Sequence, residues 1–266
     1  MKNKLISLML SAFLVLPAVL SGCESAGQGN GTLTVGVRDD IMNFGYLNEK
    51  TGNFYGLEID IAREMADRLG YADVEFVAVK PENRKRTLLD KKVDCLIAAY
   101  SITHTRNENF DFSPAYYTDI TQIMVEDSTG FEQLAQLRDK TIGVMDGANT
   151  GPELAVRLYE MGMITEEIVS DSDTETVYSN LTVRKIPSYA ELSEALETGE
   201  IDAACMDGCI SHSYMTDSRI LLDGTIQEQN YGVATNKDSE LSRPVSETIQ
   251  EMLDDGTIET LIDKWN

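Results

Sequence analysis

Arg106 follows closely on an apolar strand, and its neighbours suit the binding of an anion. The apolar run VDCLIAAY covers residues 93–100, and Ser101 and Thr103 lie between it and Arg106. A guanidinium can hold a carboxylate through two parallel N–H···O bonds and keeps its charge at physiological pH. Ligands of open α/β sheets bind beyond the carboxyl ends of the strands, where the next helix offers free N–H groups. The same pattern also fits an exposed arginine at a helix start, so the segment alone leaves both possibilities open.

The second half of the chain has two comparable junctions. The turn MDGANTG at 145–151 offers backbone N–H groups and the Thr150 hydroxyl to an anion, although it also fits a purely structural glycine turn. Asp207 ends the run IDAACMD, where its carboxylate could hold an ammonium or cap the next helix. Taken together, Arg106 for a carboxylate and Asp207 for an amine match the charges of an α-amino acid.

Alternating strands and helices are expected to position these residues. Apolar residues four apart predict a helix that ends at Gly70, and the run 93–100 is apolar on both faces, as a central parallel strand requires. This alternation predicts a parallel sheet with helical crossovers. The pattern restarts after residue 126, which indicates two α/β lobes. The expected strands are 32–38, 74–79, 93–100, 140–145 and 201–207, and the expected helices are 57–70, 83–92, 152–162, 190–199 and 241–265.

Composition restricts the class of partner. The 266 residues, 42% of them hydrophobic, are enough for one large or two small packed domains. The formal net charge of −23 is spread along the chain and repels nucleic acid, so no nucleic-acid partner is expected.

The cysteines and histidines show no spacing typical of a metal site, so neither a metal nor a cofactor is expected. Cys95 lies in an apolar strand and is predicted to be a buried thiol. Cys205 and Cys209 flank a turn, where they could form a disulfide if the local geometry allows it.

The N-terminus has the features of an export signal. The basic start MKNK precedes an apolar stretch at 5–20, which is short for a membrane span and contains Pro17. The following LSGC resembles the lipobox of bacterial lipoproteins. This resemblance implies a signal peptide at 1–22, a lipidated Cys23 and a flexible tether at 23–31, with the protein held on the outer side of the cell membrane. An ordinary signal peptide cleaved elsewhere is the alternative.

Several motifs together resemble a known family. The chain contains YGLEIDIA, SITHTRNENFDFSPAYY, IGVMDGANTG, DAACMDG and YGVATNK in this order. This order is similar to that of the extracellular solute-binding proteins of family 3, the amino-acid receptors of bacterial ABC importers. The resemblance implies a type II periplasmic-binding-protein-like fold, with a mostly parallel sheet flanked by helices in each lobe and two crossing strands. It places the first lobe at 32–125 plus 230–266 and the second at 126–229. It also implies a membrane permease as partner and a monomeric receptor.

The resemblance assigns roles at the two ends of the ligand. Arg106 would bind the ligand α-carboxylate with help from Ser101. The carbonyl of Ala99 and the carboxylate of Asp207 would accept from the α-ammonium. Thr150 would reach the carboxylate from the second lobe, but the turn is one residue longer than usual in the family, so Asn149 is the alternative.

The side-chain end of the ligand is assigned less directly. Arg38 stands where receptors for basic amino acids carry an aspartate, and Ile41 and Pro81 stand at their aromatic positions. The segment ENRKRTLL is similar to that of glutamate/aspartate receptors, whose corresponding arginine matches Arg84. Arg38 and Arg84 would then bind a side-chain carboxylate. Glutamine or another neutral polar amino acid is the near alternative, because both arginines could face solvent and either of the two aspartates after Arg38 could neutralise it.

Other classes of function remain possible. Some proteins of this fold are dehydratases of prephenate-like acids, such as cyclohexadienyl dehydratase. No nucleophile with a matching base can be identified here, so an enzyme is not expected. A sensor that signals through a separate membrane protein, or a receptor for a modified amino acid, would use the same fold.

Overall fold

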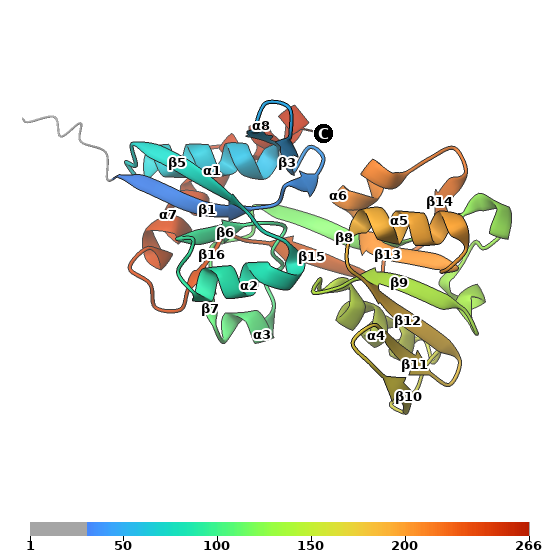
Figure 1. Ribbon diagram of the computed structural model, residues 1–266. Coiled ribbons are helices and arrows are strands. Elements are labelled where there is room, and N and C mark those ends of the chain that lie inside the picture. The colour runs from blue at the N-terminus through green and yellow to red at the C-terminus, as the bar shows by residue number, and fades with distance from the viewer. Residues whose placement is uncertain (1–30, 266) are drawn as a thin grey trace, which may run out of the picture.

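The computed structural model describes residues 31–265, which form two α/β lobes joined by two strands (Figure 1). The predicted signal peptide, Cys23 and most of the predicted tether lie outside the described residues. Within residues 31–265, no helix is long and apolar enough to cross a membrane.

The first lobe is built on a five-stranded sheet in the order β5-β1-β6-β16-β7. β1 pairs in parallel with β5 and β6, and its residues Leu33, Val35 and Val37 are completely buried. β16 returns from the end of the chain and pairs antiparallel with β6 and β7. The strands are β1 (Thr32–Val37), β5 (Asp73–Ala78), β6 (Cys95–Ile97), β7 (Phe110–Phe112) and β16 (Ala234–Asn236), and a small separate sheet contains β2 (Asp40–Ile41), β3 (Gly45–Asn48) and β4 (Asn53–Tyr55).

Helices cover both faces of this sheet. α1 (Leu57–Arg68) buries Ile61, Met65 and their neighbours against the sheet, and it packs beside α7 (Ser242–Asp254) and α8 (Thr257–Trp265). This is the apolar stripe that the four-residue spacing predicts. α2 (Pro81–Leu89) lies on the opposite face, and the short α3 (His104–Asn107) lies below it in Figure 1.

The second lobe has an eight-stranded sheet, in which seven strands follow the order β10-β11-β12-β9-β13-β8-β14 and the eighth, β15 (Gln227–Tyr231), pairs with β8. Its centre is parallel, since β9 pairs in parallel with β12 and β13, whereas the remaining pairs are antiparallel. The elements are β8 (Tyr117–Glu126), β9 (Thr141–Met145), α4 (Thr150–Glu160), β10 (Ile168–Asp171), β11 (Glu175–Tyr178), β12 (Leu181–Ile186), α5 (Tyr189–Thr198), β13 (Ala203–Asp207), α6 (Gly208–Ser211) and β14 (Arg219–Leu221), with 3-10 turns at Asp127–Thr129, Leu134–Leu137 and His212–Tyr214.

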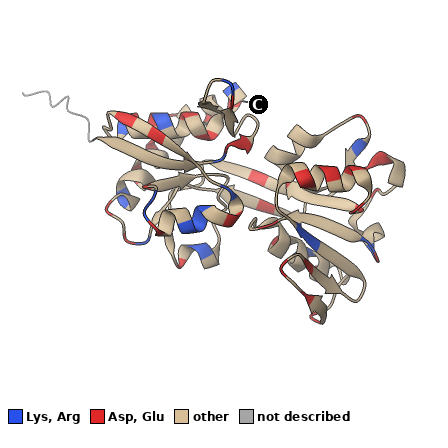
Figure 2. Cartoon of the chain, viewed as in Figure 1, with Lys and Arg blue, Asp and Glu red and all other residues tan. Residues whose placement is uncertain are grey.

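Two antiparallel strands cross between the lobes. β8 pairs with β15 (Gln227–Tyr231) from Tyr117 opposite Tyr231 to Thr121 opposite Gln227. From Thr121 onward β8 also pairs with β13 of the second lobe. Both strands carry acidic residues in the gap between the lobes (Figure 2). The first crossing therefore lies at about residues 117–121 of β8.

Two details differ from the sequence expectations. The predicted lobe boundary near residue 125 is too late, because Ile123 and Val125 already lie in the core of the second lobe. The sheets are mixed and not mostly parallel, because β16 and β8 enter each sheet from the other lobe and run against the central strands.

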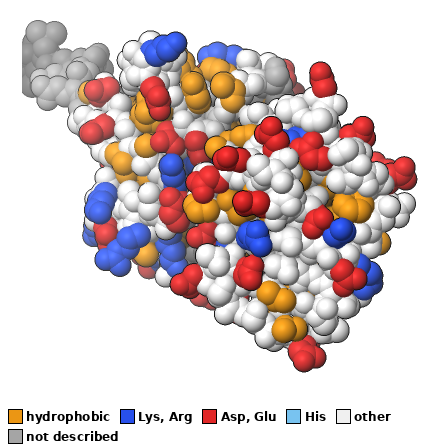
Figure 3. Space-filling view, turned by 45° about the vertical axis from the view of Figure 1, so that its right-hand side comes forward, with side chains coloured by type: hydrophobic (Ala, Val, Ile, Leu, Met, Phe, Trp, Pro, Cys, Tyr) orange, Lys and Arg blue, Asp and Glu red, His pale blue; other side chains and the backbone are white. Residues whose placement is uncertain are grey.

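The lobes touch on the side opposite the crossing strands. Gly147, which has a positive φ of 70°, packs so closely on the start of α2 that a Cβ there would lie 2.8 Å from the backbone nitrogen of Glu82. The Arg38 guanidinium lies 5.6 Å from the centre of the Tyr189 ring in the second lobe. The two lobes are therefore closed on each other. Acidic side chains are scattered over both lobes on the face shown in Figure 3.

Candidate functional site

Arg106 is held over the end of β6 by its immediate neighbours. The Arg106 N–H donates to the Thr103 hydroxyl at 3.2 Å, which caps α3, and Nη1 donates to the Ser101 carbonyl at 2.8 Å. The guanidinium lies 4.2 Å from the centre of the Tyr100 ring. Burial lowers the pKa of Arg106 from its usual value. Its side chain is thus positioned in a partly dry environment, where a bound carboxylate would be favoured.

Arg84 reaches the same ring from α2. It is 3% exposed, its guanidinium lies 4.7 Å from the Tyr100 ring centre, and Nη1 donates to the carbonyls of Ala98 at 2.6 Å and Ala99 at 3.1 Å. Burial, followed by the charges of Arg106 and Arg38, lowers the pKa of Arg84 to about 10. The guanidinium groups of Arg38, Arg84 and Arg106 together create a positive potential that favours binding of an anion.

Ala99 has a strained backbone that a buried carboxylate supports. Its φ is 46°, and its N–H donates at 2.6 Å to Glu58 Oε1, which also accepts the Tyr116 hydroxyl at 2.6 Å. Burial raises the pKa of Glu58, which is 0% exposed. The Ala99 carbonyl, expected to accept from the ligand ammonium, already accepts from Arg84, but its second lone pair can still serve a ligand.

Arg38 is neutralised within its own strand-turn segment. It is 1% exposed and donates to both oxygens of Asp40, from Nε at 2.9 Å and from Nη2 at 2.8 Å. Burial opposes the charge of Arg38, but Asp40 keeps its pKa above the usual value. One of the two aspartates that the sequence suggested as partners thus binds Arg38, so less of its charge is available to a ligand.

The second lobe contributes the start of α4. Thr150 is 0% exposed, and its hydroxyl has no hydrogen-bond partner in the protein. The side-chain amide of Asn149 donates to Glu153. Of the two residues that the sequence left open, Thr150 is therefore the one whose polar group is buried and unpaired.

Asp207 ends β13 beside the crossing strands. Its side chain makes no capping bond to α6; Oδ1 accepts from Gln229 Nε2 and lies 3.3 Å from the Thr121 hydroxyl oxygen. Burial and the charge of Asp119 raise the pKa of Asp207 to about 6. Ser101 of the first lobe donates to Gln229 Oε1, so a continuous set of hydrogen bonds joins Ser101 to Asp207 across the hinge.

Buried polar atoms without hydrogen-bond partners are candidates for contact with a polar ligand. Among residues 31–265 there are four such side-chain atoms, and nearly all buried polar groups in proteins have a partner. Two belong to predicted site residues and a third to the carboxylate behind Ala99. They are Arg84 Nε, Thr150 Oγ1, Glu58 Oε2 and Asp39 Oδ1.

The sequence missed the residues that link these groups. Thr121 and Gln229 lie on the crossing strands, and Glu58, Tyr100 and Glu153 support site residues from behind. The contacts of Thr121 and Gln229 join positions more than 80 residues apart, and no local motif encodes them.

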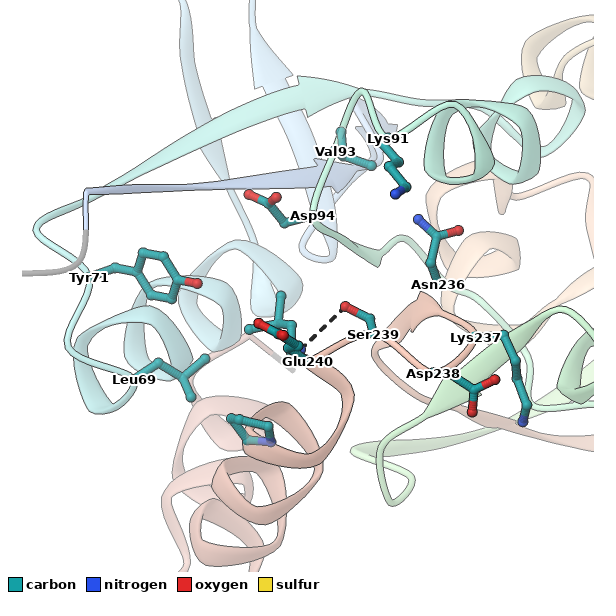
Figure 4. Close-up of a pocket in the computed structure, with 12 residues that line it drawn as sticks. Leu69, Tyr71, Lys91, Val93, Asp94, Asn236, Lys237, Asp238, Ser239 and Glu240 are labelled. Atoms are coloured by element: carbon teal, nitrogen blue, oxygen red, sulfur yellow. Dashed lines mark hydrogen bonds between the residues drawn. The ribbon is translucent and has the colours of Figure 1, made fainter.

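Other features of the described residues stay separate from this site. Figure 4 shows a pocket of about 670 Å³ formed by the first lobe alone, between Tyr71, Asp94 and the 236–244 segment. Cys95, Cys205 and Cys209 are free thiols, so the possible disulfide is not formed. Residues 31–265 contain no cluster of histidine, cysteine or acidic side chains suited to a metal.

Comparison with known proteins decides the family. Residues 33–266 match the model of the bacterial extracellular solute-binding proteins, family 3. This chain belongs to that family. It is 24% identical to the arginine-binding extracellular protein ArtP of Bacillus subtilis, over 99% of this chain and 98% of that protein. It is 25% identical to the ABC transporter glutamine-binding protein GlnH of the same organism, over 99% of this chain and 97% of that protein.

A solved structure supports the same assignment. An ancestral arginine-binding protein bound to arginine superimposes with a TM-score of 0.73 and 26% identity, over 88% of this chain and 98% of that one. The predicted two-lobed periplasmic-binding-protein-like fold is therefore confirmed. As a family 3 member, the protein is related to extracellular proteins, in agreement with the predicted export, whereas lipidation of Cys23 stays a prediction.

Proposed function

We propose that this protein is the substrate-binding component of an amino-acid ABC importer and binds a polar L-amino acid between its lobes. The observation that supports this most is the opposition of charge between the two lobes, since the field of Asp207 acts on Arg106. Arg106 and Arg84 lie on Tyr100 in the first lobe, and Asp207 and the unpaired Thr150 hydroxyl lie in the second. Such an arrangement is complementary to a zwitterion.

Each end of the ligand has a partner in this scheme. Arg106 and Thr150 bind the α-carboxylate, and Ser101 assists them when its hydroxyl, which donates to Gln229 without ligand, turns to the carboxylate. Asp207 with the Ala99 carbonyl binds the α-ammonium. Each charge-assisted hydrogen bond contributes about 1.5–3 kcal/mol net. Several of them exceed the cost of immobilising a small ligand and give micromolar or better affinity.

Glutamate or aspartate is the best candidate ligand. Arg84 has an unpaired buried Nε and belongs to a cluster of three arginines, which favours a side-chain carboxylate and repels a cationic side chain. Glutamine is the second candidate. The ion pair between Arg38 and Asp40 favours it, because that pair reduces the positive charge available to a side chain.

Binding is capture by closure, with no covalent step. The ligand contacts both lobes only when they are closed, so its differential affinity stabilises the closed form. The permease would recognise that form. A lipid on Cys23 would keep the receptor close to the permease, provided that it carries more than one acyl chain.

A thermal-shift screen over the twenty amino acids tests the proposal. A ligand of the native state raises Tm by mass action, so glutamate or aspartate should give the largest increase, and calorimetry should then give the Kd. A larger increase with glutamine would favour the second candidate. If no amino acid raises Tm, receptor function for free amino acids is refuted.

A further inference from the structure

Glu153 lies beside Asp207 although it belongs to a different element. It stands in the first turn of α4, and its Oε2 accepts from the Thr121 hydroxyl at 3.1 Å. The same hydroxyl oxygen is 3.3 Å from Asp207 Oδ1. A single hydroxyl on the crossing strand β8 therefore lies between two carboxylates.

The neighbouring donors cannot satisfy both carboxylates fully. The Thr121 hydroxyl has one hydrogen and can donate to only one of them. Gln229 Nε2 donates to the Thr121 oxygen at 2.7 Å and to Asp207, which engages both of its hydrogens. Asn149 donates to Glu153 Oε1. Two close carboxylates with so few donors favour retention of a proton until a cation arrives.

The charges around the pair are mixed. Arg106 faces it from the first lobe and favours ionisation of Glu153, whereas Asp119 on β8 opposes ionisation of Asp207, and Tyr231 on β15 donates to Asp119 at 3.0 Å. Burial, and then the charge of Asp207, raises the pKa of Glu153 to about 7. Arg84 of the first lobe also favours ionisation of Asp207. A ligand ammonium beside the two carboxylates would add a further positive charge and favour loss of the proton.

We propose that Glu153 is a second carboxylate of the ammonium-binding end and determines specificity for a ligand with a free amino group. The incoming ammonium keeps its own protons, and the proton shared by the two carboxylates leaves to solvent. No other bond forms or breaks. This inference rests on the proposed amino-acid receptor function and adds to it that capture is coupled to proton release.

The sign of the pH dependence follows from this coupling. The ligand binds better to the deprotonated pair, so affinity should rise with pH from about 5 to 8 and then level off. Because burial and the charge of Asp207 raise the pKa of Glu153 to about 7, part of the protein carries this proton at pH 7, and binding should release a fraction of a proton there.

Calorimetry of the full protein tests the inference. The best amino acid from the screen is titrated at pH 7 in phosphate and in Tris, whose different ionisation enthalpies reveal proton release. Wild type should release a measurable fraction of a proton, and Glu153→Gln should release clearly less. Glu153→Gln should also bind about tenfold more weakly at pH 8 and by a smaller factor at pH 5, where wild-type Glu153 is already protonated.

Controls separate the possible failures. Glu160→Gln changes an exposed acid at the other end of α4 and should behave like wild type. The wild-type proton count needs no variant, so misfolding of Glu153→Gln cannot obscure it. If an amino acid binds wild type without proton release, the inference is overturned while the receptor function stands. If Glu153→Gln keeps the full release, Glu153 is not the group that gives up the proton, and the inference is again overturned. If no amino acid binds at all, the receptor function itself fails.

Discussion

Replacing Arg106 with alanine should weaken amino-acid binding by about 3–5 kcal/mol, or roughly 150- to 5,000-fold in Kd. One N–H of the guanidinium is bound to the Ser101 carbonyl at 2.8 Å, and the ring of Tyr100 supports its face. At least two other N–H donors can therefore hold the ligand carboxylate, at about 1.5–3 kcal/mol each. Arg84, which lies on the same Tyr100 ring, would still attract the ligand carboxylate in the variant. The loss of binding free energy should therefore not exceed about 5 kcal/mol.

The stability of the unliganded protein should change much less. Burial lowers the pKa of Arg106, so its charge destabilises the folded protein when no ligand is bound. We therefore expect Tm without ligand to stay within a few degrees of wild type.

Isothermal calorimetry with the amino acid found in the screen provides the measurement. Arg86→Ala is the matched control, because Arg86 is an exposed arginine of α2 whose partner is Asp90. An Arg106→Ala protein that folds and binds with unchanged Kd would refute the assignment of the carboxylate to Arg106. An equal loss in both variants would point to a general effect of surface charge.

The remaining predictions concern the side-chain end, closure and a buried acid. Arg84→Ala should weaken glutamate about tenfold more than glutamine in calorimetry, and equal losses would contradict an acidic ligand. Gly147→Ala should weaken binding at least tenfold, because its Cβ would lie 2.8 Å from the backbone of α2, whereas Gly162→Ala shares the positive φ but has open space and serves as control. A normal Kd for Gly147→Ala would show that this contact is not needed for closure. Glu58 takes up a proton more readily when folded, so urea unfolding should show wild type losing stability relative to Glu58→Gln as pH rises above about 4.5, and a constant difference would be contrary evidence.

Local patterns predicted the elements that carry the site. The predicted strands at 93–100 and 201–207 correspond to β6 and β13; Asp207 is the last residue of β13, and Arg106 lies in α3, the helix that follows β6. The hairpin of β10 and β11 was missed, since its residues are exposed or half-buried and show no apolar alternation.

Contacts between distant segments account for what the sequence did not predict. The bridge from Glu153 to Asp207 depends on how α4 and β13 meet Thr121, and the link from Ser101 to Asp207 depends on Gln229 of the other crossing strand. Such contacts are consequences of the assembled fold, so a single sequence suggests the residue types but not the partners.

Gln229 joins the two lobes without adding charge. Its carbonyl oxygen accepts a hydrogen bond from Ser101, and its amide nitrogen donates to Thr121 and Asp207. A glutamate of the same length would lose both donors and put a third anion beside the pair. This position should therefore tolerate almost no change, whereas Arg38 and Arg84 can vary independently of it. Among related receptors, ligand specificity could therefore change through substitutions at Arg38 and Arg84 while the hinge residue Gln229 stayed the same.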